Sequence, residues 1–370
     1  MGWFTRLFGN TTTSTDHKNV QGAEQAAVTL KQHGVEEELA NRFIAFLTES
    51  PDHEVFHMNP RYLAERLTLD ERRTLKILLL AMYEGLVDLH WDVRCPKCGN
   101  IGHMGHSLGQ LHHEDDCAMC QFHFAPHLDH EVRVTFSPHE RFRRLPDTAN
   151  DTAFRQAINE RLGFSSGLTL MLIPEFERLF PQQRILPDES LKVTRVALIF
   201  TDLAGSTALY ARRGDPRAYH LVRLHFDALM EVADRMTGTV VKTIGDAILA
   251  AFQSPRESFL AALQMQEAID TLNEQRQLSG EERLILKVGL HCGPCLSVTL
   301  NERPDYFGTT VNTAARVQGL SHGNDIVFTD IIRTDPEVAS FLQGQSIESQ
   351  RVMLKGIDGE TLVHYLKTAS

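Results

Sequence analysis

Two aspartates in the second half of the chain lie where carboxylates can bind metal ions. Asp202 follows the apolar run 196–200, and small residues and hydroxyls come directly after it in the string Phe-Thr-Asp-Leu-Ala-Gly-Ser-Thr. Asp246 ends the string Lys-Thr-Ile-Gly-Asp, on a Gly-Asp turn between two apolar runs. Two converging carboxylates can hold two divalent cations, and backbone N–H groups at a helix start bind polyphosphate. The two strings predict in-line phosphoryl transfer assisted by two metals.

The elements that must position these aspartates follow from the hydrophobic pattern of residues 192–370. We expect an antiparallel sheet with helices on one face, in the order of a ferredoxin-like βαββαβ palm within an α+β fold. Asp202 then ends the first strand, and Asp246 lies at a hairpin tip beside it. The expected elements are a strand over 195–201, helices over 206–212 and 216–237, a hairpin over 239–244 and 247–252, a helix over 257–275, strands over 284–291 and 295–300, a helix over 310–320 and closing strands.

Four of the six cysteines have the spacing of a metal site. The order is Cys95-x2-Cys98-x18-Cys117-x2-Cys120, which fits a tetrahedral zinc ion held by two knuckles. Four protein ligands leave no open position, so we expect one structural Zn²⁺. The alternative is four unrelated buried cysteines. Eight histidines between 103 and 139 are expected at the solvated surface, with a second metal site or a pH sensor as the alternatives.

The other two cysteines form the string Cys292-Gly-Pro-Cys295, which is the thioredoxin tetrapeptide. Thioredoxin chemistry requires the first cysteine at a helix N-terminus, where its pKa is lowered. Here the string joins two expected strands, so we predict a tight structural turn. A redox-sensitive thiol pair is the alternative.

Composition limits the classes of function. The net charge of −11 does not recruit nucleic acid or anionic lipid, and no apolar run approaches the length of a membrane span. The first residues lack the apolar core of a secretory signal, so we expect a cytoplasmic protein with a frayed terminus; a weak interfacial anchor through Trp3, Phe4, Leu7 and Phe8 is the alternative.

The chain divides into four predicted segments. Residues 1–19 are expected to be disordered, and 20–139 to form a helical, winged-helix-like region with a zinc ribbon. Residues 140–190 are expected to be a helical connector, and 191–370 the catalytic domain. Residues 20–94 carry 13 Asp or Glu against 8 Lys or Arg. This acidic balance argues against a nucleic-acid partner, because DNA readers need a basic face.

Four strings make the second half similar to a known family. Besides the two strings above, Asp-Tyr-Phe-Gly-x-x-Val-Asn-x-Ala-Ala-Arg-Val and Leu-Lys-Gly-Ile-Asp-Gly follow in order. Residues 192–370 therefore resemble the catalytic domain of the class III nucleotidyl cyclases. The cysteine-bearing region, with the string Trp-Asp-Val-Arg-Cys-Pro over 91–96, resembles an uncharacterised domain that precedes bacterial cyclases.

The resemblance implies a role for each residue of the site. Asp202 and Asp246 would bind two Mg²⁺ or Mn²⁺ ions, with the Leu203 carbonyl as a further ligand. Arg316 would stabilise charge at the α-phosphate, and Asn312, on the same helix face, would orient the ribose. The residues expected at the other phosphates are Ala204, Gly205 and Ser206, through their amides, and Lys355.

Two further residues bear on the base. Lys242 would donate to adenine N1, and Asp305 would accept from the 6-amino group, whereas guanine offers the reverse pattern. The resemblance therefore implies an adenylate cyclase that forms cyclic AMP for signal transduction. The alternatives are a cyclase for GTP or a pyrimidine nucleotide, or a DNA-binding regulator with a degenerate cyclase domain.

The resemblance also implies a homodimer. In the family, the metal aspartates come from one subunit, and the base-reading pair with Asn and Arg comes from the other. Each copy of this chain carries the whole set, so two equivalent composite sites are expected. An N-terminal ligand or protein partner is expected to regulate them.

Overall fold

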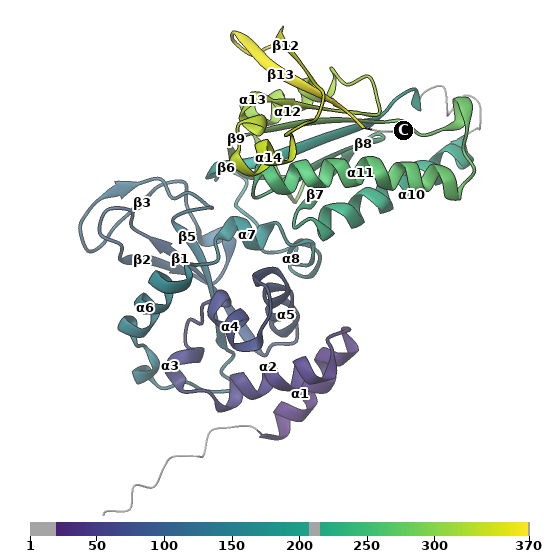
Figure 1. The fold of residues 1–370 in the computed structure, drawn as a ribbon. Helices are drawn as coiled ribbons and strands as arrows, with labels where there is room; N and C mark the ends of the chain where they lie inside the picture. Colours follow the sequence, from purple (N-terminus) through teal and green to yellow (C-terminus); the bar gives the residue numbers. More distant parts are fainter. Residues whose placement is uncertain (1–19, 207–214, 369–370) are drawn as a thin grey trace, which may run out of the picture. The chain divides into compact units, whose positions relative to one another are not determined.

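The computed structural model describes residues 20–206 and 215–368, which form two compact units (Figure 1). One unit consists of Met1–Leu89 and Phe136–Gly163, and the other of His90–Thr135 and Phe164–Ser370. The predicted region 20–139 is thus divided, since its cysteines group with the second half of the chain. The expected disorder of 1–19 and most of the expected helix 206–212 fall outside the described residues. Among those described, no helix is long and apolar enough to cross a membrane.

The first unit is mainly helical. Asn59 and Asp70 cap the starts of α4 and α5 by accepting hydrogen bonds from backbone N–H groups. The guanidinium of Arg143 is buried and donates to the carbonyls of Leu47 and Ser50. The helices are α1 (Val20–Gln32), α2 (Glu37–Glu49), α3 (Asp52–Val55), α4 (Pro60–Leu67), α5 (Glu71–Tyr83) and α6 (Thr152–Leu162), with a short 3₁₀ turn, η2 (Asp147–Ala149).

The cysteine-bearing part of the chain is built from short elements. Trp91 is fully buried and meets the ring of Phe176 edge-on at 5.9 Å, so α8 packs on this part. The elements are β1 (Val87–Arg94), β2 (Ile101–Gly105), η1 (Leu108–Gln110), β3 (Asp115–Asp116), β4 (His123–Phe124), β5 (Val132–Pro138), α7 (Gly167–Met171) and α8 (Pro174–Leu179). Strands pair in the orders β2-β1-β5 and β3-β4.

The rest of the second unit is the expected palm. Its sheet has the order β12-β13-β11-β9-β6-β8-β7, and β10 pairs with β9. The four strands at one end of this order, β9-β6-β8-β7, pair antiparallel, as in a ferredoxin-like fold. The strands are β6 (Leu191–Leu203), β7 (Thr239–Ile244), β8 (Ala247–Phe252), β9 (Leu286–Leu300), β10 (Arg303–Phe307), β11 (Asp325–Thr329), β12 (Ile347–Met353) and β13 (Glu360–Lys367). The helices are α10 (Asp215–Arg235), α11 (Pro255–Gln275), α12 (Thr309–Gln318), α13 (Asp330–Arg333) and α14 (Pro336–Phe341), with the turn η3 (Gly280–Glu282).

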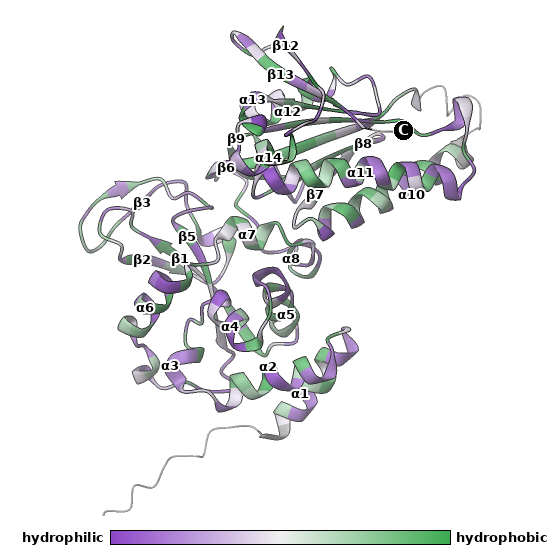
Figure 2. Ribbon diagram, in the orientation of Figure 1, coloured by the Kyte–Doolittle hydropathy of each residue, from purple (hydrophilic) through white to green (hydrophobic). Residues whose placement is uncertain are grey.

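Helices cover both faces of this sheet, which corrects the expectation of one. α10 and α11 lie side by side on one face, and both alternate between hydrophobic and hydrophilic colours in Figure 2. Val288 and Leu290 of β9 belong to the core beneath them. Gly289 lies between them and faces the opposite side of the sheet, because successive residues of a strand face opposite sides. A Cβ there would lie 2.2 Å from the backbone nitrogen of Gln318, so α12 packs on the opposite face.

The predicted turn at Cys292-Gly-Pro-Cys295 is wrong, because β9 runs through it without a break. Thr194 and Arg195 of β6 stand opposite Pro294, in a β-bulge. Proline is tolerated at a bulge because the regular ladder is already interrupted. Three residues of strand separate the two cysteines by about 10 Å, too far for a disulfide. Burial raises the pKa of both thiols, that of Cys295 to about 12, so the geometry does not support the redox alternative.

The close packing of α12 against Gly289 predicts that a larger residue at this position destabilises the chain. Gly289→Ala should destabilise the chain by roughly 3 kcal/mol, because the new Cβ meets backbone that cannot move aside without shifting α12. Urea unfolding would measure the change. Gly319→Ala, just after α12 and in right-handed helical conformation, is the matched control and should change stability by less than about 1 kcal/mol. Equal effects of the two variants would contradict the close packing of α12.

Candidate functional site

The two aspartates lie next to each other at one end of the palm. Asp202 is the penultimate residue of β6, and Asp246 follows Gly245 in the turn between β7 and β8. Gly245 has a φ of +65°, a conformation that favours glycine. The turn directs the Asp246 carboxylate back to β6, where it accepts a hydrogen bond from the Leu203 N–H at 3.3 Å.

The electrostatics of this pair suit a cation. The pKa of Asp202 is raised, first because burial removes water from the carboxyl group and then because the charge of Asp246 is close. Bound divalent cations would offset both effects, since they neutralise the repulsion between the carboxylates. Carboxylate oxygens are also the ligands that Mg²⁺ and Mn²⁺ prefer. The donor set therefore fits the expected metals.

Two neighbours of the aspartates were not predicted. Lys287 lies opposite Asp202 in the register of β9 with β6, and its charge lowers the pKa of Asp202. The antiparallel register of the two strands was the signal that could have found it. His225 of α10 is fully buried and bonds through Nδ1 to the Val222 carbonyl at 3.1 Å. Burial lowers its pKa to about 4, so a neutral imidazole lies within electrostatic reach of Asp246.

The base-reading candidates also lie together. The ammonium of Lys242, on β7, contacts a carboxylate oxygen of Asp305, on β10, at 2.5 Å. The second oxygen of Asp305 accepts the N–H of Tyr306 at 2.8 Å. The Asp305 side chain is 8% exposed and that of Lys242 is 37% exposed. This places one donor and one acceptor, from the same chain, side by side.

The remaining candidates are dispersed, and the three with polar side chains on α12 and after β12 face solvent. Asn312 and Arg316 are exposed on α12, one helical turn apart. Lys355 is exposed in the connection between β12 and β13. The Ala204 N–H donates to the carbonyl of Ile285 at 2.9 Å, so this amide, expected at the phosphates, is already engaged in the protein backbone.

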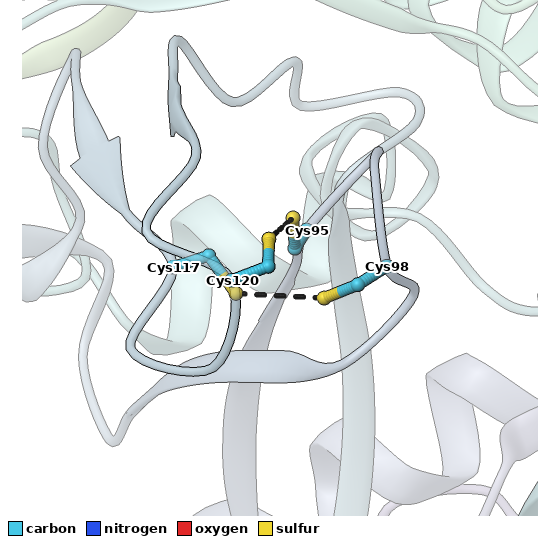
Figure 3. A group of neighbouring side chains, drawn as sticks. All are labelled: Cys95, Cys98, Cys117 and Cys120. Atoms are coloured by element: carbon cyan, nitrogen blue, oxygen red, sulfur yellow. Dashed lines mark hydrogen bonds between the residues drawn. The ribbon is translucent and has the colours of Figure 1, made fainter.

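The four expected metal-binding cysteines converge (Figure 3). Their sulfurs all lie within 4.8 Å of one another, with Cys95 to Cys120 at 3.7 Å and Cys98 to Cys117 at 3.5 Å. A tetrahedral Zn²⁺ with bonds of about 2.3 Å needs sulfurs about 3.8 Å apart. The backbone N–H of Cys120 lowers the pKa of Cys117 to about 7, whereas burial raises the pKa of Cys120 to about 12, so the spacing of the sulfurs, rather than their pKa values, is the argument for a metal. The donor set and its spacing therefore fit zinc.

The backbone around the cysteines repeats one turn. Gly99 donates to the Cys95 carbonyl at 2.9 Å, and Gln121 donates to the Cys117 carbonyl at 2.8 Å. Both donors have left-handed backbone, with φ of +75° and +54°. The two Cys-x-x-Cys segments therefore adopt the same knuckle, which presents both sulfurs of a pair to one point.

Several of the histidines near the cysteines pair with carboxylates. His112 and His113 both contact Glu189, at 2.9 and 2.7 Å. His127 contacts Glu131 at 2.9 Å, and His123 contacts Asp116 at 3.0 Å. The Glu189 contacts join the cysteine-bearing part to the segment that enters β6.

Comparison with known proteins matches two families to the chain. Residues 189–368 match the adenylate and guanylate cyclase catalytic domain, and residues 21–205 match a family of unknown function, DUF5939. An adenylate cyclase of Mycosarcoma maydis is 30% identical over 46% of this chain and 7% of its own length. An adenylate cyclase of Anabaena cylindrica is 27% identical over 37% of this chain and 30% of its own length. The chain thus spans less than a third of either relative.

Solved structures are similar over the same half. The guanylate cyclase domain of RhGC from Catenaria anguillulae, solved in complex with GTP, is 20% identical, with a TM-score of 0.42, over 48% of this chain and 99% of that one. The catalytic match covers the palm that holds Asp202 and Asp246, and the other match covers half of the chain, including the four cysteines. The chain therefore belongs to the DUF5939 family and carries, over residues 189–368, an adenylate and guanylate cyclase catalytic domain.

Proposed function

We propose that the chain converts ATP to 3′,5′-cyclic AMP and pyrophosphate, in sites shared between two copies. The ribose 3′-oxygen would attack the α-phosphorus, and the bond from that phosphorus to the β-phosphate oxygen would break. Asp202 and Asp246 would hold two Mg²⁺ or Mn²⁺ ions, with the Leu203 carbonyl. These ions, when bound, lower the pKa of the attacking hydroxyl and neutralise the leaving pyrophosphate.

The contact between Lys242 and Asp305 is the observation that supports ATP as the substrate. It holds a cationic donor beside an anionic acceptor, and adenine offers an acceptor at N1 beside a donor at the 6-amino group. Guanine would place its N1–H donor against Lys242 and its O6 acceptor against Asp305. These polar groups would then lack hydrogen-bond partners, which weakens binding. Adenylate cyclases among the relatives support this choice.

The remaining residues would position the phosphates and the ribose. Arg316 would stabilise charge at the α-phosphate with its planar fork of donors, and Asn312 would orient the ribose. Lys355 would reach the terminal phosphate, and the amides of Gly205 and Ser206 remain as phosphate ligands beside the engaged Ala204. The four cysteines would hold one structural Zn²⁺, and the N-terminal half would regulate the catalytic domain.

A nucleotide panel tests the substrate. The purified chain would be incubated separately with ATP, GTP, CTP and UTP, with Mg²⁺ or Mn²⁺, and the products identified by mass spectrometry. Cyclic AMP alone is expected, and Asp246→Asn should reduce it about 100-fold or more, because a metal ligand supplies several kcal/mol. Another cyclic nucleotide would contradict the base assignment, undiminished activity of the variant would contradict the metal site, and no product with any nucleotide would contradict the function.

Mixing variants tests the shared site. Asp202→Ala and Arg316→Ala chains should each be inactive alone, and an exchanged equal mixture should regain about a quarter of wild-type activity. Half of its dimers carry one intact site of two. Asp202→Ala mixed with Asp246→Ala is the matched control and should stay inactive, since both changes fall on the same half of the site. The same result from both mixtures would exclude a site shared in this way.

A further inference from the structure

The first strand of the palm, β6, contains a β-bulge, and a residue from another part of the chain binds the backbone N–H groups of that bulge. Thr194 and Arg195 stand opposite Pro294 alone, so the ladder between β6 and β9 is interrupted there. A bulge leaves backbone N–H groups without their ladder partners, and these groups need others. Here a single carboxylate satisfies them both.

That carboxylate belongs to Asp129, in the cysteine-bearing part. Its two oxygens accept from the Thr194 N–H at 3.0 Å each, and one accepts from the Arg195 N–H at 3.1 Å. The Asp129 side chain is only 9% exposed. Hydrogen bonds to an ionised carboxylate are about twice as strong as neutral ones. The residues before Asp129 extend the contact, since Leu128 donates to the Lys192 carbonyl at 2.7 Å.

A second set of contacts holds the approach to β6. Glu189 accepts hydrogen bonds from the His113 backbone, at 2.9 Å, and contacts the His112 and His113 rings. Upstream, the Gln183 side chain accepts from the Leu108 N–H at 2.8 Å and donates to the His106 carbonyl at 3.3 Å. Residues 183–195 are therefore held at several points by residues 106–129.

Two of the four cysteines lie between these two sets of contacts in the sequence. Cys117 and Cys120 fall between the 106–113 loop and Leu128–Asp129 in the sequence, and the strands there, β3 and β4, have two residues each. So short an element buries little apolar surface and needs a metal or another cross-link for stability. The cluster with Cys95 and Cys98 supplies such a cross-link.

We propose that residues 95–129 form a metal-dependent clasp on β6, with Asp129 as a positioning residue for the catalytic strand. The cation is Zn²⁺ or another thiophilic divalent ion. β6 is continuous from its bulge to Asp202, so the clasp fixes the strand that delivers one metal-binding carboxylate. Loss of the cation frees residues 106–129, releases the bulge and lowers turnover. The activity part of this inference rests on the proposed function, and the structural part does not.

The test uses the full chain and two independent readouts. Hydrogen–deuterium exchange would follow the peptide that contains Thr194 and Arg195, and kinetics would follow kcat and KM for ATP. Removing the cation with a chelator, with its release measured by elemental analysis, should raise exchange of this peptide at least several-fold, and adding Zn²⁺ should restore protection. A peptide from α11 serves as the internal reference.

Asp129→Asn tests the clasp without touching the cysteines. The variant should keep its metal, raise exchange at Thr194 and Arg195, and lower kcat roughly tenfold or more, since small misplacements of catalytic groups are costly. KM for ATP should change less than kcat, because the Lys242–Asp305 pair lies on other strands. Glu114→Gln removes an exposed carboxylate from the same region, where it pairs with His123, and should behave as wild type.

Each of the following results would contradict one part of the proposal. A chain that binds neither Zn²⁺ nor another thiophilic divalent ion, or unchanged exchange after cation removal, would refute the clasp. Equal effects of Asp129→Asn and Glu114→Gln would refute the role of Asp129. If cation removal raises exchange at Thr194 and Arg195 but the untreated chain makes no cyclic nucleotide, the clasp stands and the proposed function is refuted instead.

Discussion

The site depends on holding two carboxylates together at the end of a sheet. The raised pKa of Asp202 means that ionising this group is less favourable in the folded protein than in the unfolded chain. At neutral pH the pair therefore opposes folding, and the rest of the palm must offset it. Backbone pairing of β6 with β8 and β9 does so on both sides, and Lys287 reduces the repulsion. A cation that binds both carboxylates would remove this unfavourable contribution to the free energy of folding.

The same constraint explains the distribution of the other residues. The aspartates are fixed by a strand end and a tight turn, whereas Asn312, Arg316 and Lys355 are exposed on a helix and a loop. In the proposed function these three residues would bind the phosphates and the ribose, and their exposure in one copy is what a site completed by a second copy requires. In the Lys242–Asp305 contact each side chain satisfies the other, and in the proposed function a base with complementary edges would replace this contact.

Much of this arrangement could be predicted from short-range patterns. The hairpin over 239–244 and 247–252 has the bounds expected from its apolar runs and Gly-Asp turn, because a left-handed glycine is a local requirement. The cysteine cluster follows from spacing for the same reason. The break expected at Cys292–Cys295 was wrong, since Gly-Pro signals a turn unless a bulge on the neighbouring strand accommodates the proline. Three features depend on strand register, which no local pattern specifies. They are that bulge, the position of Lys287 beside Asp202, and the packing of α12 over Gly289.

The bulge shows why a separate part of the chain can influence the palm. A regular strand would satisfy its own amides through its neighbours, and no outside group would matter to it. The two residues opposite Pro294 need a hydrogen-bond acceptor for their backbone N–H groups, and Asp129 of the cysteine-bearing part supplies it. The bulge in β6 is therefore the point at which the proposed clasp would make the order of the strand depend on the order of the cysteine-bearing part. In the proposed clasp, a cation held by the four cysteines would act on the aspartates through the backbone geometry of β6, without contact with substrate.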